Sequence, residues 1–145
     1  MKRVTMLFGL LSVVMLLLVA CGGAASAPAD TAVSATPIDT ATLPLNIDAN
    51  TTAALQNQDN VLVLDVREQW EYDEGHIPGV VHLPMNDIPA SLSEIPTDQT
   101  VIVTCRSGNR SSQVTAFLRE NGFTNVHNMD GGILAWQAAG LPVER

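Results

Sequence analysis

The amino-acid sequence predicts an α/β domain built on a parallel sheet with helices on both faces. Short aliphatic and β-branched runs alternate along residues 45–145 with segments of helical spacing, an order typical of parallel sheets with helical crossovers. The runs at 61–66 and 101–104 are apolar almost throughout, as expected of strands buried on both faces. Ligands of such sheets bind beyond the carboxyl ends of the strands, so we expect the functional site there.

The first elements of the domain are short. Residues 45–47 have the composition of a strand, and Asp48 is a suitable N-cap for a helix over 49–56. A buried strand follows over 61–66, and a short helix is expected at 68–72.

The middle of the domain carries weaker signals. Glycine and proline predict a tight loop over 75–79. An edge strand is expected over 80–83 because Pro84 stops it, and residues 86–92 are long enough for one or two helical turns.

The last part of the domain holds the clearest elements. Residues 101–104 give the strongest strand signal, and apolar residues at helical spacing predict a helix over 111–120. Gly122 stands where a glycine commonly ends a helix. A short strand at 126–128 and a helix at 132–139 complete the prediction.

A cysteine stands at the carboxyl end of the strongest strand. Cys105 is followed by a short polar loop containing Gly108, and a helix opens near Ser111. This order aims backbone N–H groups and the positive end of a helix at one point, which stabilises a thiolate. The alternative is a small buried hydrophobic residue, but the flanking arginines, Arg106 and Arg110, favour a reactive and partly exposed thiol.

The N-terminus predicts export and lipid attachment. Lys2 and Arg3 precede an apolar run that ends at Ala20, as in a secretory signal. The residues around Cys21 resemble a bacterial lipoprotein box, in which cleavage precedes the cysteine and its sulfur takes a diacylglyceryl group. The alternatives are an uncleaved anchor and ordinary cleavage after Ala27.

The lipoprotein interpretation divides the chain into three parts. Residues 1–20 form the signal peptide, 21–44 the lipidated N-terminus with a flexible tether rich in Ala, Ser, Thr and Pro, and 45–145 the globular domain. The domain would then lie on the extracytoplasmic face of a cell membrane, held by its lipid.

Charge and cysteine content limit the function. The chain has 7 basic and 15 acidic side chains, and removing residues 1–20 takes away two basic residues and no acid, which leaves a net charge of −10. A chain this acidic is unsuited to binding nucleic acid, and it lacks the clusters of Lys and Arg that attract a protein to anionic lipid. Cys21 and Cys105 are the two cysteines; if Cys21 is a thioether, Cys105 has no intramolecular disulfide partner.

Several motifs together resemble the single-domain rhodanese family. They are Leu64–Glu68, Glu71–Gly79, Cys105–Ser111, Met129–Gly132 with Trp136, and Gly140–Pro142. The resemblance covers residues 45–145 and implies a central five-stranded parallel sheet flanked by helices on both faces. It also implies transfer of sulfane sulfur through a persulfide on Cys105. His82 is a mild departure from the family pattern.

The resemblance implies a site with no cofactor and no metal. The loop residues Arg106, Ser107, Gly108, Asn109 and Arg110 would bind the substrate around the Cys105 sulfur. Backbone N–H groups can hold an anionic persulfide, and a glycine lets the loop curl inward. The expected partners are a small sulfur donor such as thiosulfate and a thiol or cyanide acceptor, with a protein acceptor as a further candidate.

The charged and aromatic residues have individual expectations. Arg106 is expected to face solvent and meet the donor, whereas Arg110 either binds substrate or bonds an acidic side chain or carbonyls. Asp65 and Arg67 are expected to pair with each other or with Glu71. His76 is expected to buttress its turn, and Trp70 and Trp136 to pack in the core or at the rim; three scattered histidines without a Cys-x-x-Cys pair give no metal site.

Two other functions remain as alternatives. Phosphatases and arsenate reductases also surround an oxyanion with N–H groups and an arginine, but their loops usually place five residues between cysteine and arginine, and here four lie between Cys105 and Arg110. Asp130 is a distant candidate for the acid that such an enzyme needs. The third interpretation is a non-catalytic sulfur carrier or binding module.

Overall fold

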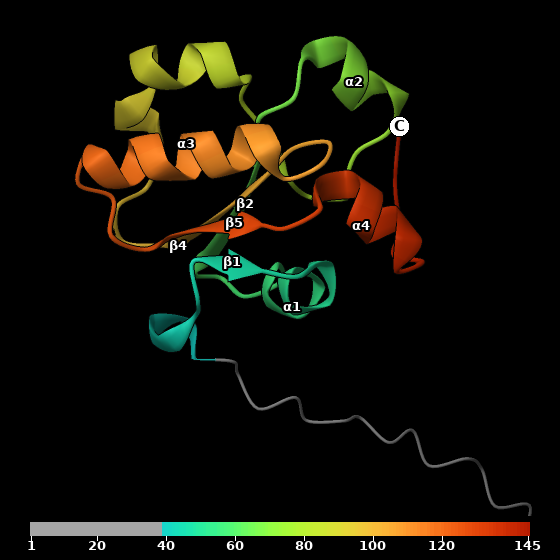
Figure 1. Cartoon of the computed structure of the whole chain (residues 1–145), viewed down its shortest axis with the longest axis horizontal. Coiled ribbons are helices and arrows are strands. Elements are labelled where there is room, and N and C mark those ends of the chain that lie inside the picture. The colour runs from blue at the N-terminus through green and yellow to red at the C-terminus, as the bar shows by residue number, and fades with distance from the viewer. Residues whose placement is uncertain (1–38) are drawn as a thin grey trace, which may run out of the picture. The chain divides into compact units, whose positions relative to one another are not determined.

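The computed structural model describes residues 39–145. This part of the chain contains one five-stranded parallel sheet in the order β1-β5-β4-β2-β3 (Figure 1), which confirms the predicted fold class. The strands are β1 (Asn46–Ile47), β2 (Val61–Asp65), β3 (Val81–His82), β4 (Thr100–Thr104) and β5 (Val126–Met129). β3 lies at an edge, as the proline after it predicts.

The helices follow the predicted order with small shifts in their bounds. They are α1 (Ala49–Leu55), α2 (Gln69–Glu74), α3 (Asn109–Glu120) and α4 (Gly132–Ala138). Asp48 is the N-cap of α1, and its carboxylate accepts a hydrogen bond from the Thr51 N–H over 2.7 Å. Residues 86–92 fall in two 3-10 segments, η2 (Met85–Ala90) and η3 (Leu92–Glu94), and Pro89 inside η2 lacks the N–H that an α-helical bond would need.

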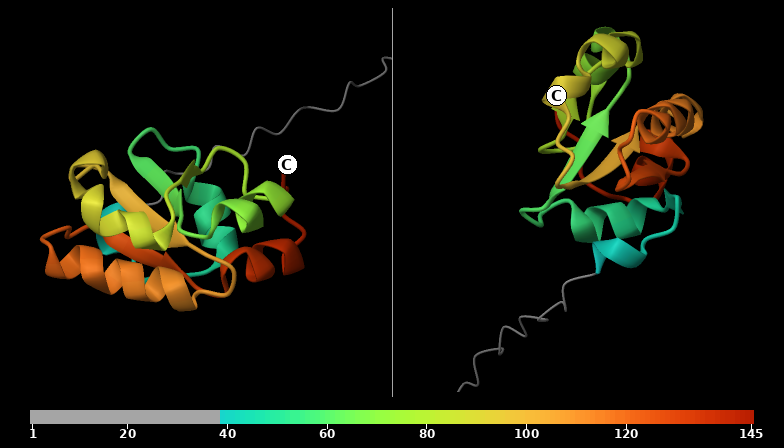
Figure 2. Two further views of the ribbon diagram at one scale, coloured as in Figure 1. Left: turned by 90° about the horizontal axis from the view of Figure 1, so that it is seen from above. Right: turned by 90° about the vertical axis from the view of Figure 1, so that its left-hand side faces the viewer.

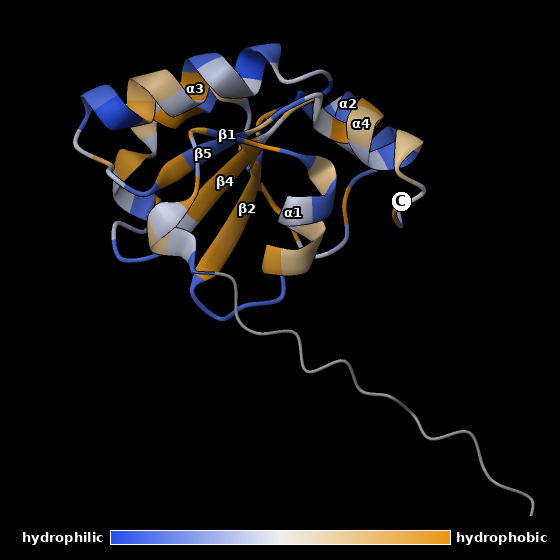
Figure 3. Ribbon diagram, turned by 60° about the horizontal axis from the view of Figure 1, so that its bottom comes forward, coloured by the Kyte–Doolittle hydropathy of each residue, from blue (hydrophilic) through white to orange (hydrophobic). Residues whose placement is uncertain are grey.

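Two apolar layers enclose the sheet. Alternate residues of a strand face opposite sides, so Val101 and Val103 pack with residues of α3, η2 and η3, while Ile102 packs with residues of α1 and α4. Figure 2 shows helices on both faces of the sheet. Every residue of β4 is buried, and the hydrophobic residues concentrate along β2 and β4 at the centre of the sheet (Figure 3). Because β4 is the central strand, Cys105, the residue after it, lies at the middle of the edge formed by the carboxyl ends of the strands.

The structured part begins before residue 45. A 3-10 turn, η1 (Thr40–Thr42), starts after Asp39, and Leu43 packs against the apolar layer of α1 and α4. The carbonyl oxygen of Pro44 lies 2.7 Å from Nδ1 of His127. The end of the segment predicted as a tether therefore packs on the domain, whereas the predicted signal peptide and Cys21 lie outside the described residues. Within residues 39–145, no helix has both the length and the apolar character needed to cross a bilayer.

Candidate active site

Cys105 lies on the face of the sheet that α3 covers. It follows β4 directly and continues the alternation of Val101 and Val103, so its side chain enters the same apolar layer. The residue is 1% exposed. The expectation of a partly exposed thiol is therefore wrong. The strand alternation directs the Cys105 side chain into the apolar layer under α3, and the loop after Cys105 turns back and covers the sulfur on that same face.

The loop and the first turn of α3 direct hydrogen-bond donors at this sulfur. The Gly108 N–H donates to Sγ over 3.2 Å, and the Ser111 hydroxyl lies 3.4 Å from Sγ. Burial raises the pKa of the Cys105 thiol, but hydrogen bonds from the Ser111 hydroxyl and from the N–H groups of Ser111, Ser107 and Gly108 outweigh it and hold the pKa below 9.0. A stabilised thiolate at this position was the central expectation from the sequence.

The start of α4 holds the same loop from outside. The Ile133 N–H donates to the carbonyl oxygen of Cys105 over 2.8 Å, and the Leu134 N–H donates to that of Arg106 over 3.1 Å. A Cβ atom on Gly132 would overlap these two loop residues. With its carbonyls bonded outward, the loop has its N–H groups free to face the sulfur.

Gly108 has the backbone conformation that the inward curl requires. Its φ is 90°, and a Cβ atom there would lie 2.9 Å from the backbone nitrogen of Gly131. Both the left-handed conformation and the close contact therefore favour glycine. The Asp130 carboxylate lies beside this glycine and accepts a hydrogen bond from the Gly131 N–H over 3.0 Å.

Arg110 bonds an acidic side chain, one of the two roles open from the sequence. Its Nη1 and Nη2 atoms donate to the two carboxylate oxygens of Glu71 over 2.6 and 2.7 Å. The Glu71 carboxylate also accepts from the Glu68 N–H at the start of α2 over 3.2 Å. Hydrogen bonds from Arg110 are the main reason that the pKa of Glu71 lies below 4.5. This ion pair ties α3 to α2 at the mouth of the site.

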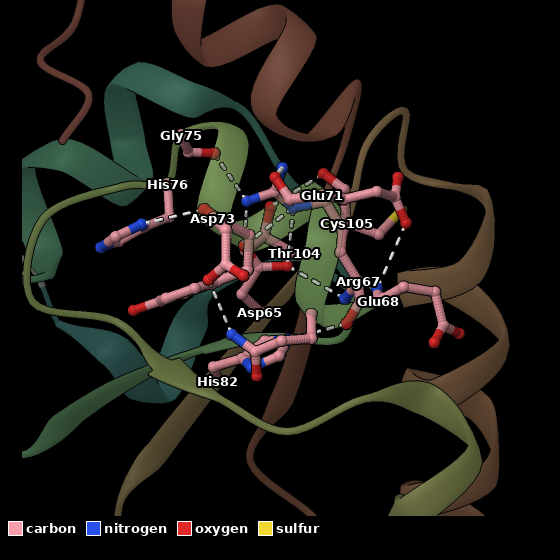
Figure 4. Close-up of polar contacts among 12 residues, drawn as sticks. Asp65, Arg67, Glu68, Glu71, Asp73, Gly75, His76, His82, Thr104 and Cys105 are labelled. Atoms are coloured by element: carbon pink, nitrogen blue, oxygen red, sulfur yellow. Dashed lines mark hydrogen bonds and ion pairs between the residues drawn. The ribbon is translucent and has the colours of Figure 1, made fainter. Parts of the chain in front are cut away.

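Arg67 and Asp65 form the mutual ion pair expected from the sequence (Figure 4). The Arg67 Nη2 atom lies 2.7 Å from a carboxylate oxygen of Asp65, and both side chains are buried. Arg67 also donates to the carbonyl oxygens of Glu71 over 2.8 Å and Gly75 over 3.0 Å. Arg67 thereby joins the loop after β2 to a residue within α2 and to Gly75, the residue that caps the end of this helix. His76 buttresses its turn as expected, with Nδ1 lying 3.1 Å from the carbonyl oxygen of Tyr72.

The remaining predicted loop side chains point away from the sulfur. Arg106 is exposed and lines a pocket of about 260 Å³ between α2 and α4, beside Trp70 and Leu134. The side chains of Ser107 and Asn109 are exposed, and the Asn109 side-chain oxygen accepts from Gln113 over 3.2 Å. Cys105 is thus surrounded by loop backbone, with Arg106 at the rim. Of the tryptophans, Trp70 lies at the rim and Trp136 is fully buried.

Two buried polar residues beside Cys105 were not predicted as part of the site. The Ser111 hydroxyl lies 2.6 Å from Oδ1 of Asn128, and the two residues are 0% and 3% exposed. Ser111 could have been found from its place in the first turn of the helix after the loop. Asn128 gives a weaker signal, because its strand β5 also contains the polar His127 and a polar residue there does not stand out.

Comparisons with known proteins agree with this geometry. The family model described as a rhodanese-like domain matches residues 48–139. A sulfurtransferase of Allochromatium vinosum is 45% identical over 89 residues, which is 61% of this chain and 83% of that protein. Thiosulfate sulfurtransferase GlpE of Pseudoalteromonas translucida is 38% identical over 88 residues, 61% of this chain and 84% of its own length.

Solved structures show the same likeness. The crystal structure of a rhodanese-related protein from Thermoplasma volcanium superposes with a TM-score of 0.63 at 31% sequence identity. That likeness covers 70% of this chain and 98% of the other. The residues that the family model matches include four of the five strands, β2 to β5, and the loop that surrounds Cys105.

Proposed function

This chain belongs to the rhodanese-like family, and on that premise we propose that it is a sulfurtransferase that carries sulfane sulfur as a persulfide on Cys105. The arrangement around Sγ is the observation that supports the proposal most directly. Donors from Gly108 and Ser111 converge on one sulfur atom at the end of a buried strand. A thiolate held in this way is a nucleophile and needs no separate general base.

The first step loads the enzyme. The Cys105 thiolate attacks the sulfane sulfur of a donor such as thiosulfate, a new S–S bond forms, and the donor's own S–S bond breaks. Sulfite leaves with the electron pair of the broken bond, so the enzyme persulfide and sulfite together carry the charge that the thiolate and thiosulfate brought. The N–H groups of the loop stabilise the negative outer sulfur.

The second step unloads it. A thiophilic acceptor, such as cyanide or a thiolate on a small molecule or protein, attacks the outer sulfur. The acceptor–sulfur bond forms as the persulfide bond breaks, and its electron pair returns to Cys105 as the thiolate. Because one product leaves before the acceptor reacts, the scheme requires ping-pong kinetics.

The loop geometry favours sulfur transfer over phosphatase or arsenate reductase chemistry. Those reactions need an arginine that closes over an oxyanion, whereas Arg110 has both terminal nitrogens engaged by Glu71. The spacing of four residues between Cys105 and Arg110 also gives a smaller ring, better suited to one sulfur atom than to a phosphoryl group.

Intact mass after thiosulfate treatment tests the proposal. We expect a gain of one sulfur atom that cyanide removes, together with steady formation of thiocyanate from thiosulfate and cyanide. Hydrolysis of a small aryl phosphate without any sulfur gain would contradict it. Loading and unloading without turnover on any small acceptor would point instead to a non-catalytic sulfur carrier.

We also propose that the protein is an exported lipoprotein anchored through Cys21. The proposal is supported by the basic start, the apolar run and the small residues around Cys21. More than one acyl chain at Cys21 would make the membrane anchoring stable, because a single chain binds a membrane only marginally. In a bacterial host, labelled fatty acid should enter the wild-type protein and not Cys21→Ser; equal labelling of both would contradict this anchor.

A further inference from the structure

The hydroxyl of Ser111 lies between two acceptors. Its Oγ atom is 2.6 Å from Oδ1 of Asn128 and 3.4 Å from Sγ of Cys105. All three residues are at most 3% exposed, so water does not readily replace either partner. A serine hydroxyl has one proton and can donate to only one acceptor at a time.

The Asn128 amide is oriented by a second contact. Its Nδ2 donates to Oδ1 of Asn46 over 3.0 Å, which leaves the amide oxygen directed at Ser111. When Cys105 is a thiol, its S–H can donate to Ser111 Oγ while the hydroxyl donates to Asn128. When Cys105 has lost its proton to solvent, the sulfur can only accept, and it needs the hydroxyl proton that Asn128 holds.

We propose that Asn128 is a positioning residue that competes with the Cys105 sulfur for the single hydroxyl proton of Ser111. Ser111 keeps its proton throughout and changes only the acceptor to which it donates. The competition keeps the pKa of the Cys105 thiol higher than it would be if Ser111 were free to donate to the sulfur together with the loop amides. A thiolate of higher pKa is the stronger nucleophile, so the contact would balance thiolate population against reactivity. This inference rests on the proposed role of Cys105 as the nucleophile.

Charged groups near Cys105 are separate from this contact. From the elements packed around the sulfur they are Arg106, Arg110, Glu68, Glu71, Asp65, Arg67 and Asp130. Arg110 is paired with Glu71, and Arg67 with Asp65. Apart from the Cys105 sulfur itself, the side chains of Ser111 and Asn128 have no charged partner among the hydrogen bonds of residues 39–145. A change at Asn128 therefore acts on the sulfur through Ser111.

The pH dependence of Cys105 alkylation by iodoacetamide tests this competition. The full chain carrying Cys21→Ser leaves Cys105 as the one reactive thiol. Asn128→Val removes the competing oxygen and suits a strand. We expect it to lower the pKa of Cys105 by about 0.5 to 1 unit, the size of one ordinary hydrogen bond. Asn128→Ala should shift the pKa in the same direction and serves if the valine does not fold.

A double substitution separates this mechanism from a general movement of the loop. In the Ser111→Ala background, Asn128→Val should leave the Cys105 pKa unchanged, because no hydroxyl proton remains to be shared. An unchanged or raised pKa in the single variants, or the same downward shift without Ser111, would overturn the inference. Alkylation needs no sulfur donor, so a chain that shows the expected shifts but takes no sulfur from thiosulfate would contradict the proposed function alone.

Discussion

The backbone N–H of Ile133 donates to the carbonyl oxygen of Cys105 over 2.8 Å, which joins the first turn of α4 to the residue that carries the sulfur. A peptide plane is rigid, so fixing its carbonyl on one side directs the next N–H to the other. The same helix also binds the carbonyl of Arg106. The first two peptides of the loop, which lead to the Ser107 N–H, are therefore oriented by a helix that donates none of the hydrogen bonds found at Sγ.

Gly132→Ala should disrupt the site through this contact. The added Cβ would overlap the backbone of Cys105 and Arg106, so the loop or the helix must move. A displacement of about 1 Å commonly costs about a hundredfold in rate. We therefore expect transfer of sulfur from thiosulfate to cyanide to fall by roughly ten- to a hundredfold in steady-state assays.

Gly140→Ala is the matched control for that substitution. Gly140 also has a positive φ, 72° against 56° for Gly132, but nothing lies within 4 Å of the Cβ that alanine would add. Both variants should lose about 1–2 kcal/mol of unfolding free energy from the left-handed conformation. Equal transfer rates in the two variants would mean that the α4 contact does not position the loop.

The sequence predicted the sheet, its edge strand β3 and the loop at the end of β4, because each depends on local patterns. It placed the start of α3 at Ser111, two residues after the observed start at Asn109, because the N-cap residue is Gly108 and a glycine offers no side-chain cap to mark the helix start. The burial of Cys105 depends on which face the residue takes and on the return of the loop above it. The contacts to Asn128 and to α4 join distant segments, and no periodic pattern in one sequence encodes them.

Cys105→Ala should abolish transfer while leaving the fold intact. The variant loses the atom that bonds sulfur, and the loop carbonyls keep their bonds to α4. Thiosulfate should then add no sulfur to the protein, as judged by intact mass, while circular dichroism matches the wild type. Full thiocyanate formation by this variant would refute Cys105 as the nucleophile.

Glu71→Gln should destabilise the domain. The Glu71 carboxylate is nearly buried and accepts two bonds from the Arg110 guanidinium, which is about one-third exposed. Bonds to charged groups contribute about 1.5–3 kcal/mol each in favourable cases, and the exposure of Arg110 reduces this. We expect a loss of about 1–3 kcal/mol in urea unfolding. Gln69→Ala, which removes an exposed bond to Asp73 in the same helix, should cost far less.

The Glu71 carboxylate should make the free energy of unfolding depend on pH in the acidic range. Hydrogen bonds from Arg110 hold the folded-state pKa of Glu71 below 4.5, so folding favours its ionised form. Its contribution is complete above the unfolded-state value and is lost as pH falls below about 4.5 through the folded-state pKa. The free energy of unfolding, measured from pH 6 to 3, should therefore fall less steeply in Glu71→Gln than in the wild type. Part of the fall should remain in the variant, because the pKa of Asp48 is also lowered in the folded state. Parallel curves for the two proteins would contradict this assignment.

Arg106→Gln should weaken donor binding more than it slows the reaction. Arg106 is exposed at the rim, and its side chain has no acidic partner among the ion pairs of residues 39–145. In an acidic protein such a local cation attracts an anionic donor within a Debye length of about 8–10 Å. We expect KM for thiosulfate to rise about three- to tenfold with kcat nearly unchanged. Arg119→Gln removes the same charge at the other end of α3, where the side chain bonds the carbonyl of Val126, and it should leave KM almost unaltered. An equal rise in KM for both variants would mean that net charge, and not the position of Arg106, governs donor binding.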